Sequence, residues 1–294
     1  MKLNKTLCKS ILTRTSGYLK EVSSHSVNPY VGCGFGKSSC GVGCYVRHNQ
    51  WLLKGREWGG FIDVKMNSAE IYCKTWKAEK NWAVKRGLRF SLFCSSSTDP
   101  WQPMERKYRV TRRLLEAIRD SPPEQLILQT HSDLVRDDRN LILELSKVCD
   151  LRLHVSIEGD RDSLPEMPPP PCSVRSRLDV VEDFAGLGVC VVVCVSPLYP
   201  MINPQLFFEH LRKSGVRAVV IDHFIEGDGS KEGSRTLRTF LPKAIARIDA
   251  KSNQLSYRDK IVAIAKEYLP VGISRNGFAG NYFYSGEISA VSAK

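Results

Sequence analysis

Three cysteines in a glycine-rich segment are the residues whose types and spacing could do chemistry. Cys33, Cys40 and Cys44 follow a C-x6-C-x3-C pattern within residues 27–49, VNPYVGCGFGKSSCGVGCYVRHN. Small residues let a short loop fold around a compact inorganic body and point backbone N–H groups at its sulfurs. Three thiolates suit a [4Fe–4S] cluster with one iron left open, whereas His48 as a fourth ligand would give a structural zinc site. The spacing alone leaves the cluster, zinc and the absence of metal open.

The composition is that of a soluble globular protein. The 294 residues are 42% hydrophobic and 25% charged, enough for one large core. No apolar run reaches the roughly 18 residues that cross a bilayer, and the basic start lacks the apolar stretch of a signal peptide. We therefore expect a cytoplasmic protein without membrane association. The ten cysteines are then expected to be reduced thiols, some of them ligating metal.

The charge points to a class of partner. A formal net charge of +12 and a pI near 9.3 favour polyanions such as nucleic acid. Much of this charge is spread along helical patterns, and a solvated basic face explains it as well. The charge therefore suggests nucleic acid as a partner without identifying it.

Short β-rich runs alternate with helical patterns through the middle of the chain. Strands are predicted at 89–94, 125–130, 152–157, 189–195 and 218–222, and helices at 138–148, 173–187 and 203–214. Asn203 is the expected N-cap of the last of these, and Ser256 with Asp259 resembles a capping box for a later helix. This order predicts an α/β fold with a parallel sheet and right-handed crossovers, open or curled into a partial barrel. Its chemistry belongs at the carboxyl ends of the strands.

An ordered series of motifs adds a family resemblance. After NPYVGC come STDPWQPMERKYRVTRRLLEAI at 97–118, LQTHSDLVRDD at 128–138, HVSIEG at 154–159, and RSRLDVVEDFAGLGVCVVVCVSPLYPMIN at 175–203. Together they resemble the spore photoproduct lyase-like branch of the radical S-adenosylmethionine (SAM) superfamily over roughly residues 11–215. The resemblance implies a partial (β/α)6 barrel over 28–225, with an N-terminal extension over 1–27 and a C-terminal, substrate-specific extension over 226–294.

The same resemblance implies the cofactors and their ligands. Cys33, Cys40 and Cys44 would hold a [4Fe–4S] cluster whose open iron binds SAM. An electron from a donor such as flavodoxin or ferredoxin would cleave SAM, and the 5′-deoxyadenosyl radical would take a hydrogen atom from the substrate. Two features depart from the family pattern: relatives space their cysteines C-x3-C-x2-C, and they carry an aromatic residue where this chain has Gly43. Tyr45 or Phe35 could take the place of that aromatic residue against the adenine.

Further cofactor contacts are implied at the strand ends. The loop with Ser95, Ser96 and Asp99 matches the region that meets the amino end of SAM, although these residues could merely end a strand and cap the helix near Pro103. His131 falls where relatives carry a cation facing the SAM carboxylate. Ser156 matches a serine that reaches the methionine or ribose part, and it could equally be an ordinary polar strand residue.

Cys94 has two interpretations. It lies near the position at which the thymine-dimer lyase uses a cysteine to return a hydrogen atom to the product radical, which would make it catalytic. The sequence favours the other interpretation, a buried strand cysteine, as it does for Cys190 and Cys194.

The sequence therefore predicts a radical SAM enzyme whose substrate is unknown, with DNA lesion repair or nucleotide modification first among its activities. One alternative is a radical SAM enzyme that modifies peptides or small molecules. The other is a nucleic-acid-binding protein stabilised by zinc or an Fe–S cluster that does not cleave SAM.

Overall fold

A parallel sheet forms the centre of the computed structural model, which describes residues 1–284. Its strands run in the order β11-β10-β9-β8-β7-β6-β3-β2, and every neighbouring pair from β3 to β11 is parallel, while β2 is antiparallel to β3. The bounds are β2 (Leu12–Arg14), β3 (His25–Val27), β6 (Ser91–Cys94), β7 (Gln125–Thr130), β8 (Asp150–Ser156), β9 (Val191–Val195), β10 (Ala218–Ile221) and β11 (Val271–Ile273). Strands β2 and β11 lie at the two edges, and no ladder joins them within residues 1–284, so the sheet is open.

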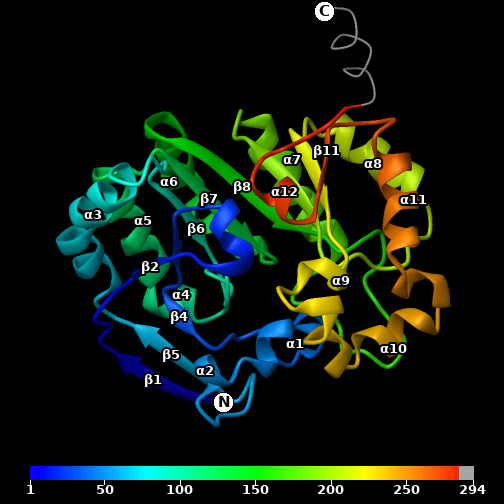
Figure 1. The fold of residues 1–294 in the computed structure, drawn as a ribbon, viewed down its shortest axis with the longest axis horizontal. Coiled ribbons are helices and arrows are strands. Elements are labelled where there is room, and N and C mark those ends of the chain that lie inside the picture. Colours follow the sequence, from blue (N-terminus) through cyan, green and yellow to red (C-terminus); the bar gives the residue numbers. More distant parts are fainter. Residues whose placement is uncertain (285–294) are drawn as a thin grey trace, which may run out of the picture.

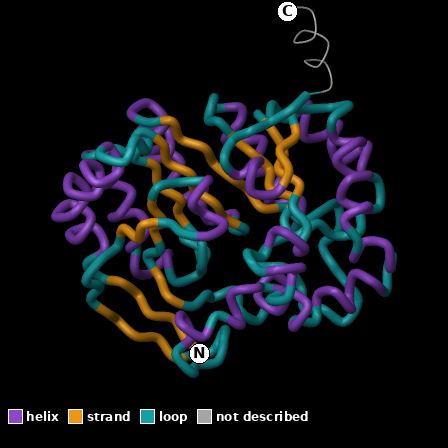
Figure 2. Tube along the Cα trace, in the orientation of Figure 1, coloured by secondary structure: helices purple, strands orange, loops and turns teal. Residues whose placement is uncertain are grey.

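Six longer helices lie outside the curved row of strands (Figures 1 and 2). They are α3 (Ser68–Val84), α5 (Val110–Asp120), α6 (Arg139–Val148), α7 (Val174–Gly186), α8 (Pro204–Lys213) and α11 (Leu255–Ala265). The predicted α/β fold with parallel crossovers is confirmed. The five predicted strands and three predicted helices are present with small shifts of their ends.

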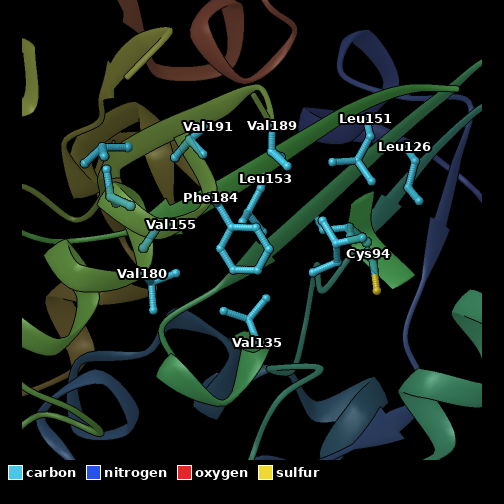
Figure 3. Close-up of a cluster of buried hydrophobic side chains, with 14 of the residues drawn as sticks. Cys94, Leu126, Val135, Leu151, Leu153, Val155, Val180, Phe184, Val189 and Val191 are labelled. Atoms are coloured by element: carbon cyan, nitrogen blue, oxygen red, sulfur yellow. The ribbon is translucent and has the colours of Figure 1, made fainter. Parts of the chain in front are cut away.

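The sheet has an apolar layer on each face because its central strands are covered on both sides. Alternate residues of each strand pack under the outer helices, as Figure 3 shows for Leu126 and Leu153, which lie in one cluster with Phe184 of α7. The intervening residues, among them Phe93 and Cys194, face the inside of the curve and form a smaller cluster with Phe278. Which face a strand residue occupies therefore decides whether it can reach a site inside the curve.

A second, three-stranded sheet carries the cysteine segment. Its order is β1-β5-β4, with β1 (Lys2–Thr6) parallel to β5 (Phe61–Lys65) and β4 (Tyr30–Val31) antiparallel to it. Between β4 and β5 lie α1 (Ser39–Gly43), the 3-10 helix η2 (Tyr45–His48) and α2 (Gln50–Leu53). This sheet was not predicted from the sequence.

Short helical segments complete the chain. They are η1 (Gly17–Glu21), α4 (Glu105–Tyr108), η3 (Asp133–Asp138), α9 (Phe224–Gly227), η4 (Lys231–Gly233), η5 (Thr236–Arg238), α10 (Leu241–Ala246), η6 (Ala250–Asn253) and α12 (Ser274–Phe278). No helix within residues 1–284 is long and apolar enough to cross a membrane.

Of the two predicted helix caps, one is confirmed and one is wrong. Asn203 caps α8, its side chain accepting from Leu206 N at 3.0 Å. Ser256 does not cap α11, because the helix begins at Leu255 after Gln254, so Ser256 is already helical. A Ser–Asp pair three residues apart also occurs inside a first turn, and spacing alone cannot tell the two positions apart.

The expected extensions belong to the same sheet. Residues 1–27 contribute β2 and β3, and β11 comes from the segment after residue 225. Residues 285–294 of the expected C-terminal extension lie outside the described part of the chain.

Candidate active site

The three cysteines of the glycine-rich segment line one cavity. Cys33 follows β4, Cys40 is in the first turn of α1, and Cys44 directly follows that helix. The opposite wall of the cavity is formed by residues 95–99 after β6 and by the end of β7. The structure thus brings the predicted ligands together opposite strand ends of the central sheet.

Tight backbone packing sets the shape of this segment. A Cβ on Gly41 would lie 2.2 Å from the carbonyl oxygen of Phe35, so only glycine fits there. Ser38 caps α1, its hydroxyl oxygen accepting from Gly41 N, and the same hydroxyl donates to Phe35 O at 2.7 Å. Cys33, Phe35, Val46 and Leu53 belong to one hydrophobic cluster that supports the segment from behind.

The thiols have the chemistry of a metal site. Burial and the neighbouring Cys40 raise the pKa of the Cys33 thiol well above its ordinary value, and the same two causes raise the pKa of Cys44 to about 12. Such thiols become thiolates when a cationic centre stands beside them. The side chains of Cys33, Cys40 and Cys44 line one cavity, and three cysteine ligands fit a [4Fe–4S] cluster. No three His, Cys, Asp or Glu side chains within residues 1–284 are close enough to chelate a single ion.

His48, the alternative fourth ligand, is not among the residues that line the cysteine cavity. Its pKa is lowered by burial and by the guanidinium groups of Arg238 and Arg47. The structure therefore does not bring the predicted Cys3His zinc set together.

The loop after β6 faces the cysteines. Ser95 has a φ of 91°, a left-handed conformation that costs free energy for a residue other than glycine and is often found at functional sites. Ser96 accepts from Asn28 Nδ2 at 2.9 Å, and its carbonyl accepts from the Tyr45 hydroxyl at 3.0 Å. Ser95, Ser96 and Tyr45 all line the cavity, so the structure gathers three of the predicted cofactor contacts.

Asp99 has its carboxylate occupied by protein groups. Oδ1 accepts from Trp101 N at 2.9 Å and from Thr130 Oγ1 at 2.8 Å, and Oδ2 accepts from His131 N at 2.7 Å. Asp99 therefore joins the loops after β6 and β7. It does not cap the short helix α4, whose N-cap is Met104. It still lines the cysteine cavity.

His131 lies at the centre of the polar groups. Its Nε2 is 3.2 Å from Glu158 Oε1 and its Nδ1 is 3.8 Å from Asp99 Oδ2. Burial lowers the pKa of His131, but Cys40, Asp99 and Glu158 raise it well above its ordinary value. The acidic neighbours of His131 therefore favour its protonated form.

Ser156 and Gln129 are joined by a hydrogen bond. Ser156 is fully buried at the end of β8, and its hydroxyl accepts from Gln129 Nε2 at 3.2 Å. Sequence analysis missed Gln129. This residue, and not Ser156, lines the cysteine cavity and the two cavities next to it. The signal was present in QLILQT, where two glutamines interrupt an apolar strand, but the face on which they lie depends on the sheet.

Cys94 lies in the hydrophobic core. None of its surface is exposed, and it packs in one cluster with Leu126 under the outer helices (Figure 3). Phe93 beside it belongs to the cluster that faces the inside of the curve. A hydrogen donor has to reach the cavity, so this geometry favours the core interpretation over the catalytic one. Cys194 has the opposite orientation and faces the inside.

A larger cavity of about 400 Å³ adjoins the cysteine cavity. The two share Tyr45, Gln129 and residues 95–97. The larger one extends to Tyr18 on η1, Asp222 after β10 and Phe278 on α12. Neither Tyr18 nor Asp222 was singled out from the sequence. Two joined cavities offer separate space for a cofactor and a substrate.

The comparisons with known proteins agree with this architecture. No family model matches the chain. An uncharacterized protein of Methanocaldococcus jannaschii is 25% identical over 249 residues, which covers 83% of this chain and 87% of that protein.

Solved structures show which fold this is. A variant of spore photoproduct lyase with a dinucleoside spore photoproduct superposes with a TM-score of 0.64 at 14% identity, over 93% of this chain and 81% of that one. A second variant, with bound SAM and the dinucleoside spore photoproduct, gives a TM-score of 0.61 at 13% identity over the same shares. The chain has an open, parallel α/β fold with a cysteine loop facing its strand ends. That fold is the fold of spore photoproduct lyase.

Proposed function

We propose that this protein is a radical SAM enzyme. One observation carries the proposal: Cys33, Cys40 and Cys44 line one side of a cavity whose other side is formed by the ends of β6 and β7. Three cysteine ligands leave one iron of a [4Fe–4S] cluster free to bind a cofactor. The shared fold with spore photoproduct lyase supports the same conclusion.

The residues around the cysteines can hold SAM. The imidazolium of His131 offers a cation for its carboxylate, and the strained turn at Ser95 and Ser96 presents hydroxyl and carbonyl groups for its ammonium. Tyr45, next to Cys44, places a ring at the border between the two cavities. When bound, the cluster would supply the electron that cleaves SAM to methionine and a 5′-deoxyadenosyl radical.

Nucleic acid is the first substrate class in this proposal. The net charge of +12 supports it, as does the dinucleoside bound by the structural relatives. Modification of a peptide or a small molecule is the second class. A metal-stabilised binding protein without SAM cleavage accounts less well for the two joined cavities beside the cysteines. A cytoplasmic location, where thiols stay reduced, belongs to the same proposal.

In this proposal an electron donor binds the surface around α2. Leu53 of this helix packs in one cluster with Cys33, while Trp51 on the same helix is 92% exposed. Lys54, three residues after Trp51, is also exposed. An exposed aromatic ring followed by an exposed lysine suits a small acidic carrier such as flavodoxin or ferredoxin.

Anaerobic reconstitution tests the proposal. The protein should take up about four iron and four sulfide ions per chain and release 5′-deoxyadenosine from SAM when a reductant is added. Cys40→Ala should lose both properties. Cys73→Ala is the matched control, because Cys73 is exposed on α3 and should leave both unchanged. Zinc bound in place of iron, or a cluster that never cleaves SAM, would contradict the proposal.

A further inference from the structure

Asp222 is a buried carboxylate outside the set of residues proposed to hold the cluster and SAM. It directly follows β10 and is 3% exposed. Its Oδ2 accepts from Ser196 Oγ at 3.0 Å, while Oδ1 has no hydrogen-bond partner within residues 1–284. The residue lines both the large cavity and the neighbouring one that reaches Cys40 and Cys44. A buried carboxylate oxygen without a donor is costly, and such a group commonly marks a ligand site.

A second orphaned acceptor lines the same two cavities. Gln129 gives its amide nitrogen to Ser156, which leaves Oε1 buried and without a partner in the described chain. The hydroxyl of Tyr18, in the large cavity, is also buried and unpartnered there. The rings of Phe93, Phe278 and Tyr45 contribute apolar and aromatic surface to the large cavity. The site thus combines two free acceptors, on Asp222 and Gln129, and a hydroxyl that can donate or accept with flat aromatic walls.

The charges of the large cavity argue against an anion beside Asp222. Arg235 is the cation among the lining residues, and its Nη1 donates to Asp228 O at 3.2 Å. The carboxylate of Asp228 is occupied, since it accepts from Ser230 N at 2.9 Å and from Thr236 N at 2.8 Å. Arg235 is exposed and keeps further N–H groups, but the buried unpartnered atoms of Asp222 and Gln129 are acceptors, so a phosphate placed against them would meet a negative charge.

We propose that Asp222 and Gln129 bind a planar, N–H-donating group of the substrate, namely an amide, imide or guanidinium group that is neutral or cationic. This inference rests on the proposed function for calling the ligand a substrate. Donors on such a group would satisfy Asp222 Oδ1 and Gln129 Oε1, and its flat faces would lie against the aromatic walls. Where the substrate is a polymer, its phosphates would lie outside this cavity.

Two further observations support the role of the carboxylate. A Cβ on Gly227 would lie 2.3 Å from Asp222 Oδ2, so the backbone of α9 packs directly against the carboxylate and limits its movement. Burial raises the pKa of Asp222 to about 6, while the hydroxyls of Ser274 and Ser196 act to lower it; the Ser274 hydroxyl lies near the carboxylate but makes no hydrogen bond within residues 1–284. A donating ligand would favour the ionised form and relieve this cost.

Three probes of nearly the same shape test the inference. Benzamidine is a planar cation with only N–H donors, benzamide is neutral with donors and an acceptor, and benzoate is an anion with only acceptors. Their binding to the reconstituted full-length protein is measured by calorimetry at pH 7.5, alongside SAM cleavage. The order benzamidine, benzamide, benzoate is expected from tightest to weakest, with no detectable benzoate binding.

Variants then assign the binding to these residues. Asp222→Asn should weaken benzamidine binding at least about tenfold, the effect of losing one charge-assisted hydrogen bond. Asp183→Asn, which removes the same charge from the surface of α7, should not change it. Gln129→Leu provides an independent variant, also expected to weaken binding, should Asp222→Asn fail to fold.

The outcomes separate this inference from the proposed function. Equal binding of benzoate and benzamidine, no benzamidine binding up to its solubility, or full binding by both Asp222→Asn and Gln129→Leu would overturn the inference, whether or not SAM is cleaved. Selective binding that depends on Asp222 in a protein that never cleaves SAM would keep the recognition site and reject the radical SAM function.

Discussion

The guanidinium of Arg177 lies 2.7 Å from the carboxylate of Glu158, and both side chains are almost fully buried. Arg177 Nη1 also donates to the carbonyl of Ser156 at 2.7 Å, so α7 is joined to the end of β8. Glu158 in turn contacts His131 on the cavity wall. A buried ion pair thus supports the cation that we assign to the SAM carboxylate.

Removing one partner of this pair should be strongly destabilising. Arg177→Met leaves Glu158 charged in a buried setting, which should lower the free energy of unfolding by about 3–5 kcal/mol. Urea denaturation measures the change. Arg175→Met is the matched control on the same helix, since the ion pair of Arg175 with Asp179 is solvent-exposed and should contribute at most about 1 kcal/mol. Similar losses in both variants would contradict the buried role of Arg177.

Asp222 should make stability depend on pH in a defined direction. Its pKa is raised from 3.8 to about 6, so the acid contributes stability in full below about pH 4 and loses it as the pH rises through about 6. Asp222→Asn cannot ionise and should gain stability relative to the parent protein from pH 4 to pH 8. The gain is at most about 3 kcal/mol.

Charged and titratable groups around Asp222 come from several elements, namely Cys194 on β9, Tyr18 on η1, Tyr45 on η2, Arg258 on α11 and Glu226 on α9. The measurement is therefore the difference between variant and parent in thermal unfolding at each pH. Asp183→Asn corrects for the loss of one charge. A difference that does not change with pH would show that Asp222 titrates normally.

Trp51 should affect electron delivery without affecting the cluster. Trp51→Ala is expected to slow SAM cleavage with a flavodoxin or ferredoxin as reductant, and to leave the rate with dithionite unchanged, because dithionite needs no docking surface. Leu206→Ala is the control, since Leu206 is 62% exposed on α8. Equal rates for Trp51→Ala and the parent with the protein donor would exclude α2 as the docking surface.

Cys94 should behave as a core residue. Cys94→Ala leaves a small cavity under the outer helices and should cost about 1–2 kcal/mol of stability. The yield of 5′-deoxyadenosine per chain should stay at the parent value once folded protein is compared. An altered product pattern with substrate, at unchanged stability, would instead restore the hydrogen-donor interpretation.

The sequence predicts the central sheet because β7, β8, β9 and β10 are apolar runs separated by helical patterns. It does not predict β3 and β11, which are three residues long, or β1, whose sequence KLNKT is polar at the edge of the second sheet. Such strands exist through their tertiary pairing and have no periodicity of their own.

The candidate site, too, could be predicted from the sequence only in part. The cysteines could be predicted because they share one short segment. Gln129 and Asp222 could not, because they end β7 and β10 and meet only across the curve of the sheet. Whether a strand residue points inward or under the helices follows from the register, which also separates Cys94 from Phe93.

Gly41 has a consequence for how the metal centre would be assembled. Its backbone is pressed against Phe35, so the protein's own packing helps to set the path of the loop that carries the three cysteines. Small zinc domains, by contrast, fold only when the metal arrives. A side chain at position 41 would therefore displace the thiols that would hold the cluster without replacing any of them.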